Sequence, residues 1–224
     1  NGARAEVYLH GAHVTSWIPA GASADRLFVS ARSKWSEGAA IRGGIPVCFP
    51  QFAAQGPLPM HGFARVSAWE LVNAHRTDTG AARAVLSLCD SDTTHALWPH
   101  AFTAELRVTV AGRGLEIVLS VANSGDAAFA FTAALHTYLR VAHVRQVAVR
   151  GLAGARYLDK NLKRDGEIET APELAITTAI DRVYYTAPAD LEVREPQRTL
   201  AIRAAGFPDT VIWNPDAQGG AGIA

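Results

Sequence analysis

Apolar and polar residues alternate with a period of two through two neighbouring stretches of this chain. In residues 102–110 every second side chain is apolar, and residues 115–121 repeat the pattern after the turn Gly112-Arg113-Gly114. Because successive side chains of an extended chain point to opposite faces, the alternation predicts two paired strands with one buried face. The strongest constraint on the fold is therefore a β-hairpin.

Shorter stretches with strand character occur along the rest of the chain, separated by turns rich in Gly, Asp, Asn and Pro. They are Ala5–Leu9, His13–Ile18, Ala84–Leu88, Val144–Arg150, Thr199–Arg203 and Thr210–Trp213. No segment has the period of a long amphipathic helix. Many short strands at fairly regular spacing predict an all-β sandwich or barrel. We expect a single domain over residues 1–224, because no linker or internal repeat interrupts the sequence.

The charge balance limits the partners of the chain. Its 224 residues (23.8 kDa) contain 21 Lys and Arg against 21 Asp and Glu, so the formal net charge is zero. We therefore expect neither nucleic acid nor a membrane as a partner, and any anion-binding site must be local. The longest apolar runs are far shorter than the roughly 20 residues that span a bilayer.

Metal and cofactor signatures are missing from the sequence. Cys48 and Cys89 have no metal-ligand spacing, and no phosphate-binding loop or nucleophile elbow occurs. Two buried free thiols are expected, with a disulfide between them left open, and free thiols suit a reducing compartment. Since no signal peptide is recognisable, a cytoplasmic location is predicted. His10, His13 and His143 are expected to be surface or core residues without a special role.

A segment rich in glycine, proline and aromatic residues, residues 41–69, is a candidate binding site. Arg42 precedes Gly43-Gly44, and His61 and Arg65 follow in the same segment. Glycine lets backbone approach a ligand closely, and the guanidinium fork suits an oxyanion. The alternative is that both arginines lie on surface turns and that His61 only stabilises its loop.

A second candidate is His136. Residues 129–141 alternate again, which predicts a strand with His136, Tyr138 and Arg140 on the less apolar face. A histidine among polar neighbours can act as a general acid or base because its pKa lies near neutrality. The commoner alternative is a strand histidine that only bonds a neighbour.

Asp181 follows a β-like run over residues 174–180. A carboxylate at this place could orient a histidine or bind sugar hydroxyls. The alternative is a turn role or a charge contact with Arg182.

Six segments together resemble the hexose-6-phosphate mutarotases, or glucose-6-phosphate 1-epimerases, of the aldose 1-epimerase superfamily. They follow the order of the family and span nearly the whole chain: Gly11–Trp17, Ile41–Pro50, Pro59–Arg65 with Trp69, Leu135–Tyr138, Asp181–Tyr184 and Val211–Pro215. Arg-Gly-Gly-Ile-Pro combined with His-Gly-Phe-Ala-Arg is specific to this branch, and several agreeing segments outweigh any single motif.

The resemblance implies a fold, a reaction and roles for five residues. It implies a β-supersandwich of the galactose mutarotase type and an isomerase that interconverts the anomers of a hexose 6-phosphate without metal or organic cofactor. Separately, we expect a monomer, although the sequence does not fix the oligomeric state. A histidine corresponding to His136 is the general acid on the ring oxygen, and a glutamate is the general base. Arginines corresponding to Arg42 and Arg65 bind the substrate. An aspartate corresponding to Asp181 holds sugar hydroxyls, and His61 lies in the same pocket.

The sequence departs from the family pattern near its ends. The catalytic glutamate of the family follows the Trp213-Asn214-Pro215 segment, whereas Glu192 and Glu195 precede it. We therefore expect a chain truncated at both ends, without the strand that carries this glutamate. Met60, Ala179 and Asp216 also replace residues that are common in the family, so the substrate preference could differ.

Three alternatives stay open. The first is a module that binds a sugar phosphate without turnover because the base is absent. The second is an epimerase of unphosphorylated aldoses, against which the arginine pair argues. The third is a glycoside hydrolase, which needs two positioned carboxylates that the recognised segments do not offer.

Overall fold

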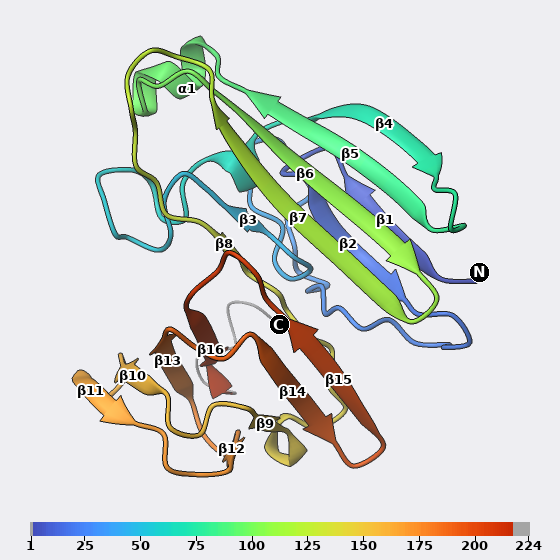
Figure 1. The fold of residues 1–224 in the computed structure, drawn as a ribbon, viewed down its shortest axis with the longest axis vertical. Coiled ribbons are helices and arrows are strands. Elements are labelled where there is room, and N and C mark those ends of the chain that lie inside the picture. The colour runs from blue at the N-terminus through green and yellow to red at the C-terminus, as the bar shows by residue number, and fades with distance from the viewer. Residues whose placement is uncertain (1, 217–224) are drawn as a thin grey trace. The chain divides into compact units, whose positions relative to one another are not determined.

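The computed structural model describes residues 2–216 as an arrangement of short β-strands (Figure 1). The chain divides into two compact units, residues 1–140, here unit 1, and residues 141–224, here unit 2. The helical elements with defined bounds are short: α1 (Asp92–Leu97) and the 3-10 helices η1 (Ala64–Val66) and η2 (Val144–Gln146). The prediction of an all-β protein is confirmed. Organisation as a single domain stays a prediction, and the two units are described one at a time.

Unit 1 contains a four-stranded antiparallel sheet in the order β4-β5-β6-β7, and two-stranded sheets that pair β1 with β2 and β3 with β8. The bounds of these strands are β1 Arg4–Tyr8, β2 His13–Ile18, β3 Val47–Cys48, β4 Glu70–Arg76, β5 Ala82–Cys89, β6 Phe102–Ala111, β7 Gly114–Asn123 and β8 Ala134–Leu135. Isolated bridges outside the strands, such as Val14 with Ile45 and Leu27 with Leu139, connect the remaining backbone.

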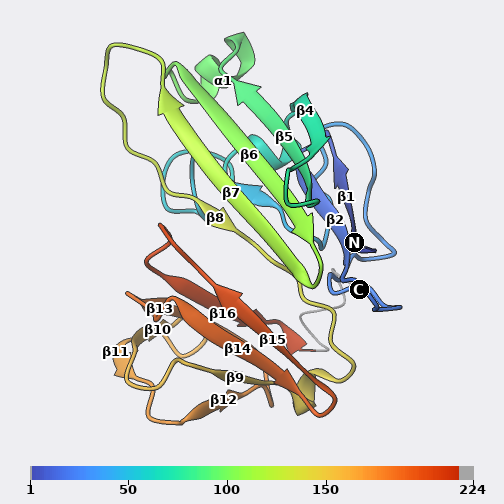
Figure 2. The ribbon, with the colours of Figure 1, turned by 45° about the vertical axis from the view of Figure 1, so that its right-hand side comes forward.

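The hairpin predicted from the alternating pattern is formed by β6 and β7. The two strands pair from Phe102 opposite Asn123 to Ala111 opposite Gly114, and Figures 1 and 2 show them as long neighbours beside β5. Every second side chain of β6 is buried. Phe102 is fully buried, with its ring centroid 5.4 Å from that of Phe49. The buried face of the β6–β7 hairpin thus packs against Phe49, which lies in the candidate binding segment, residues 41–69.

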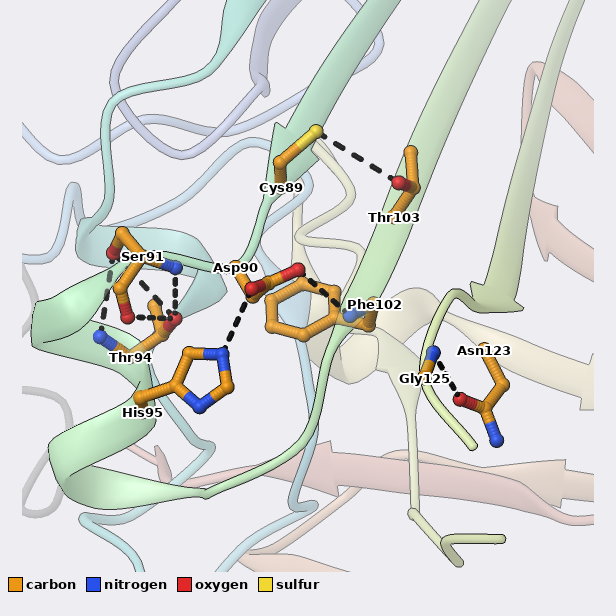
Figure 3. Close-up of polar contacts among 9 residues, drawn as sticks. All are labelled: Cys89, Asp90, Ser91, Thr94, His95, Phe102, Thr103, Asn123 and Gly125. Atoms are coloured by element: carbon orange, nitrogen blue, oxygen red, sulfur yellow. Dashed lines mark hydrogen bonds and ion pairs between the residues drawn. The ribbon is translucent and has the colours of Figure 1, made fainter. Parts of the chain in front are cut away.

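A short helix, α1, follows β5 and is capped by its own sequence. Thr94 N donates to the Ser91 hydroxyl (3.3 Å) and Ser91 N donates to the Thr94 hydroxyl (2.8 Å), which is a reciprocal capping box. Asp90 accepts hydrogen bonds from Phe102 N (3.0 Å) and from the His95 ring (2.8 Å; Figure 3). This carboxylate therefore ties the end of β5 to both the helix and the start of β6.

The segment 129–141 is not the continuous strand that its alternation predicts. Only β8 within it is a strand, paired with β3. Around β8, Thr132, His136 and Tyr138 donate to Pro50, Pro46 and Gly44 in the same antiparallel register as the β3–β8 pair, and Arg140 donates to Arg26. Because Pro46 and Pro50 have no N–H to return these bonds, the ladder is incomplete on both sides of β8.

Unit 2 consists of two four-stranded antiparallel sheets, ordered β11-β10-β13-β16 and β12-β9-β14-β15. Their strands are β9 Ala148–Arg150, β10 Arg156–Asp159, β11 Arg164–Ile168, β12 Glu173–Ala175, β13 Ile180–Tyr185, β14 Asp190–Glu195, β15 Arg198–Arg203 and β16 Thr210–Asn214. The two sheets share one core, with Tyr157 and Tyr184 from the first and Val149, Leu174 and Leu191 from the second (Figure 2).

Two strand predictions in unit 2 hold only in part. The stretch 144–150 is a strand only in β9, because its first residues form η2. In the stretch 174–180, the first two residues belong to β12 and Ile180 belongs to β13, while residues 176–179 lie in neither strand. Five strands, β3, β4, β10, β11 and β14, are not predicted at all. In β4 and β11 every residue is exposed, so no buried face imposes an alternating pattern.

The two cysteines are free but differ in burial. Cys48 is fully buried in β3, as predicted, whereas Cys89 is exposed and the prediction of burial there is wrong. The reason is the alternation of β5: Leu86 and Leu88 face the core, so residue 89 faces outward. No helix in the described part of the chain is long and apolar enough to cross a membrane.

Candidate active site

The turn that carries Arg42 packs closely against the protein's own backbone. Gly43 and Gly44 have φ angles of +111° and +61°. A Cβ at Gly43 would lie 2.3 Å from Phe28 O, and one at Gly44 would lie 2.4 Å from Val14 O. The close approach expected for a ligand is therefore made by the chain itself, and only glycine fits there. Arg42 is exposed at the edge of this turn.

His61 lies in a loop that a buried glutamine holds together. Gln51, 3% exposed, donates to Ala53 O (3.0 Å) and Leu58 O (3.1 Å) and accepts from Leu58 N (3.0 Å). His61 is tied to the same loop twice, because its N donates to Ala53 O (2.9 Å) and its Nδ1 accepts from Ala53 N (3.1 Å). Since Nδ1 is the acceptor, the neutral ring carries its proton on Nε2.

Arg65, in η1, is half-buried beside a second arginine. Its Nη2 donates to Met60 O (2.8 Å), while its Nε is buried without a hydrogen-bond partner among the described residues. Burial is the main cause that lowers the pKa of the Arg65 guanidinium; Cys48 opposes the shift, the Arg42 charge adds to it less strongly, and Tyr138 opposes it least. No ion pair in the described part of unit 1 involves Arg42 or Arg65. The two arginines form a local positive charge that the described chain does not neutralise.

His136 and Tyr138 share one face of their segment, as the alternation predicts. Their rings are stacked, with centroids 4.7 Å apart and planes 17° apart. The backbone is held from two sides, because Tyr138 N donates to Gly44 O (2.8 Å) and Phe28 N donates to Tyr138 O (2.9 Å). Burial raises the pKa of Tyr138, although the charges of Arg42 and Arg65 act against the shift.

A row of rings connects the two arginines with the two histidines. Tyr138 lies within electrostatic range of Arg42 and Arg65 and stacks on His136. The His136 ring meets the His61 ring edge-on, with centroids 5.7 Å apart and planes at 90°. Arg42, His61, Arg65 and His136 therefore lie in one cluster of unit 1. One end of the cluster suits an oxyanion, and the other offers two imidazoles for hydrogen bonding and proton transfer.

Asp181, the fifth predicted residue, belongs to unit 2 and lies on β13. Its Oδ1 is 3.4 Å from Lys160 Nζ, and the two side chains are 27% and 34% exposed. Arg182 points to the opposite face of the sheet, so the alternative of an Asp181–Arg182 charge contact is wrong. In the register of the sheet, Trp213 of β16 lies directly opposite Asp181. The charge partner of Asp181 is thus a lysine that the sequence analysis does not single out.

Arg182 belongs to a buried polar network in unit 2. It donates from Nε to Asp159 (3.0 Å) and from Nη1 to Glu169 (3.0 Å), and its guanidinium lies 4.5 Å from the Tyr157 ring centroid. The Tyr184 hydroxyl also donates to Glu169 (2.9 Å). Asp159 and Glu169 are only 5% and 6% exposed. These groups satisfy one another, so the network has a structural role.

Sequence reasoning overlooks one residue at the cluster in unit 1. His13, which we expected to have no special role, is fully buried with Nε2 at 2.7 Å from Gly43 O. Nothing in the local sequence reveals this contact, because 30 positions separate the two residues. The described residues contain no group of three or more His, Cys, Asp or Glu that could hold a metal ion.

Comparison with known sequences identifies the relatives of the chain. The sequence model described as "Aldose 1-epimerase" matches residues 1–223. A curated protein of Escherichia coli K12 named "Putative glucose-6-phosphate 1-epimerase" is 40% identical over 225 residues, which cover 95% of this chain and 71% of that protein. A protein of the same name from Cenchrus ciliaris is 34% identical over 220 residues, which cover 94% and 67%.

Solved structures show the same fold. A Salmonella typhimurium crystal structure, described as that of a "putative mutarotase", has a TM-score of 0.86 and 34% identity, and the match covers 95% of this chain and 71% of that one. A galactose mutarotase related enzyme from Lactobacillus acidophilus has a TM-score of 0.74 at 18% identity, covering 96% and 78%. The predicted fold of the galactose mutarotase type is confirmed.

Proposed function

The chain belongs to the aldose 1-epimerase family, and from that premise we propose that it interconverts the α and β anomers of a hexose 6-phosphate, with glucose 6-phosphate as the first candidate. The main support is the pair Arg42 and Arg65, which no carboxylate neutralises within the described part of unit 1. A phosphoryl group matches such a pair, whereas a free sugar offers no anion. The names of the relatives agree with a phosphorylated substrate.

The proposed roles follow from the row of rings. Arg42 and Arg65 bind the phosphoryl oxygens. His136 is the general acid, and His61 supports it as a hydrogen-bond donor, because its Nδ1 already accepts from the backbone and the neutral ring then carries its proton on Nε2. For Asp181 the proposed role, binding of sugar hydroxyls, comes from the family resemblance alone.

The reaction requires one proton to be given and one to be taken. His136 protonates the ring oxygen while a base removes the proton of the anomeric hydroxyl, so the C1–O5 bond breaks and an aldehyde forms. Rotation about C1–C2 presents the other carbonyl face. On ring closure His136 takes its proton back from the O5 hydroxyl and the base returns its proton to the carbonyl oxygen, so the reaction has no net proton change and needs no oxidant or reductant.

The proton acceptor is, by the family resemblance, a glutamate that follows the Trp213-Asn214-Pro215 segment. Glu195 is a poor substitute, because its carboxylate already accepts from Ala142 N (2.8 Å) and pairs with Arg198. An activity assay of the 224-residue chain therefore also tests whether these residues contain a base.

Anomer exchange measured by NMR saturation transfer tests the proposal, with glucose 6-phosphate and glucose compared at equal concentration. We expect exchange above the buffer rate for the phosphate ester only, and a loss of about 10²- to 10⁴-fold in His136→Ala. His75→Ala, at an exposed position of β4, is the matched control and should exchange like the unchanged chain.

The other outcomes identify the alternatives. Equal exchange of both sugars would point to an epimerase of unphosphorylated aldoses. Phosphate-dependent binding without exchange would point to a binding module that lacks the base. Exchange that survives His136→Ala would exclude this histidine as the acid.

A further inference from the structure

The turn Gly11-Ala12-His13 connects the two segments that carry the arginines of the proposed phosphate site. At its first residue, Gly11 N donates to Ser67 O (2.7 Å), and a Cβ on Gly11 would lie 2.5 Å from Arg65 O. At its last residue, His13 Nε2 lies 2.7 Å from Gly43 O, directly after Arg42. Three residues thus reach from the backbone of one arginine to the turn of the other.

The contact with Gly43 determines the tautomer of the His13 ring. The side chain is fully buried, and because a carbonyl can only accept, Nε2 must be the donor to Gly43 O. A Cβ at Gly44 would lie 2.7 Å from the same Nε2, so the ring packs against a position that only glycine can occupy. The next residue is also fixed, because Ile45 N donates to Val14 O (2.9 Å).

The His13 imidazole affects the arginine cluster through its position and not through a charge. Burial lowers the pKa of His13 to about 4, against the opposing effect of the Gly43 bond, and the charges of His10 and Arg65 lower it too. At neutral pH the imidazole is uncharged. The positive charge of the cluster then comes from the two arginines, and anion binding depends on where they are held.

We propose that His13 is a positioning residue that sets the spacing of Arg42 and Arg65 for a single phosphoryl group. The inference rests on the proposed function, because the spacing matters only if both arginines bind the same anion. Arginine recognition of phosphate depends on the geometry of the donors as well as on charge. A residue with a merely structural role would change stability, or the binding of every ligand alike.

Three substitutions separate these roles. His13→Gln keeps a donor near the place of Nε2, His13→Asn places its amide near Nδ1, where it cannot reach Gly43 O, and His13→Met fills the volume without a donor. His75→Gln on the exposed strand β4 is the matched control. Thermal unfolding first establishes that each variant is folded. If His13→Met does not fold, His13→Asn replaces it in every comparison.

Calorimetric titration with glucose 6-phosphate, inorganic phosphate and glucose is the main measurement. We expect His13→Met and His13→Asn to weaken both phosphate ligands about tenfold, as the loss of one buried hydrogen bond predicts. His13→Gln should bind within about twofold of the unchanged chain, and glucose should be unaffected. Unchanged phosphate affinity in His13→Met or His13→Asn, or an equal loss for glucose, would overturn the inference.

A second measurement separates this inference from the proposed function. If the unchanged chain binds neither phosphate ligand, the proposed function fails in this chain. The ¹⁵N–¹H resonances of Arg42 Nε and Arg65 Nε, recorded without ligand, then test the positioning role alone. His13→Met should shift both resonances and His75→Gln neither, and resonances that stay in place would overturn the positioning role.

Discussion

Arg65 in unit 1 and Arg182 in unit 2 are both partly buried, yet their surroundings are opposite. Arg182 donates to two buried carboxylates; burial by itself would lower its pKa, but the contacts with Tyr184 and Asp159 raise it overall. Arg65 donates to one backbone carbonyl, keeps an unpartnered Nε among the described residues and has a lowered pKa.

The difference distinguishes a charge that stabilises the fold from a charge that can bind a ligand. Removing an arginine from water costs free energy, which nearby carboxylates can offset. In unit 2 the carboxylates are present, so the guanidinium is fully used by its own sheet. In unit 1 no carboxylate among the described residues offsets the cost of removing the Arg65 guanidinium from water. Such uncompensated charges are typical of functional sites. Burial alone is therefore a poor guide, and the missing counter-charge is the informative observation.

Removing Arg182 should produce the largest effect. Arg182→Met leaves Asp159 and Glu169 buried without a cation, so we expect a loss of about 3–5 kcal/mol in the free energy of unfolding. Urea denaturation measures it. Arg203→Met is the matched control, because its partner pair with Asp190 is exposed and should be worth less than about 1 kcal/mol. Equal losses in the two variants would show that the network is not stabilising.

The second-largest effect is expected from lowering the pH, which should destabilise unit 1 before unit 2. The pKa of His13 is about 4 in the folded chain and 6.5 in the unfolded chain, so the unfolded chain binds more protons between these values. Unit 1 should therefore lose up to about 3 kcal/mol as the pH falls from 6.5 towards 4. In unit 2, burial raises the pKa of Asp159, but the bonds from Leu162 and Arg182 lower it overall, so stability there should be lost only below its ordinary pKa of 3.8.

Hydrogen exchange followed by mass spectrometry at pH 7, 5.5 and 4.5 resolves the two units. Peptides from unit 1 should lose protection first, after correction for the intrinsic pH dependence of exchange. His13→Gln removes the titrating group and should abolish most of this dependence. Loss of protection in both units at the same pH, or an unchanged dependence in His13→Gln, would contradict the prediction.

Removing Arg65 should have the smallest effect on stability but a clear effect on binding. Arg65→Met deletes one of two like charges, so we expect the free energy of unfolding to change by no more than about 1 kcal/mol. Binding of glucose 6-phosphate should weaken by about 1.5–3 kcal/mol, the value of a hydrogen bond to a charged group. Calorimetry and urea denaturation on the same sample measure both. A loss of stability with unchanged binding would make Arg65 a structural residue like Arg182.

Local patterns are sufficient for the parts of this protein in which one face of a strand is buried. The alternation in β6 predicts its pairing with β7, and His13–Ile18 is predicted with its observed bounds. The same logic fails for β4, where all residues are exposed, and for residues 129–141, where Pro46 and Pro50 of the partner segment cannot donate to a ladder. Periodicity reports burial on one side of a chain, so it cannot indicate strands that bury neither side.

The sequence by itself determined the all-β class, the central hairpin and, through the family resemblance, the residue types of the candidate site. Only the tertiary structure decided which charges are compensated. Arg65 and Arg182 differ in their surroundings because Asp159 and Glu169 reach Arg182, while no carboxylate forms an ion pair with Arg65 in the described residues of unit 1. The contact of His13 with Gly43 joins residues 30 positions apart. Such contacts depend on how distant segments pack, and that information is absent from any short stretch of sequence.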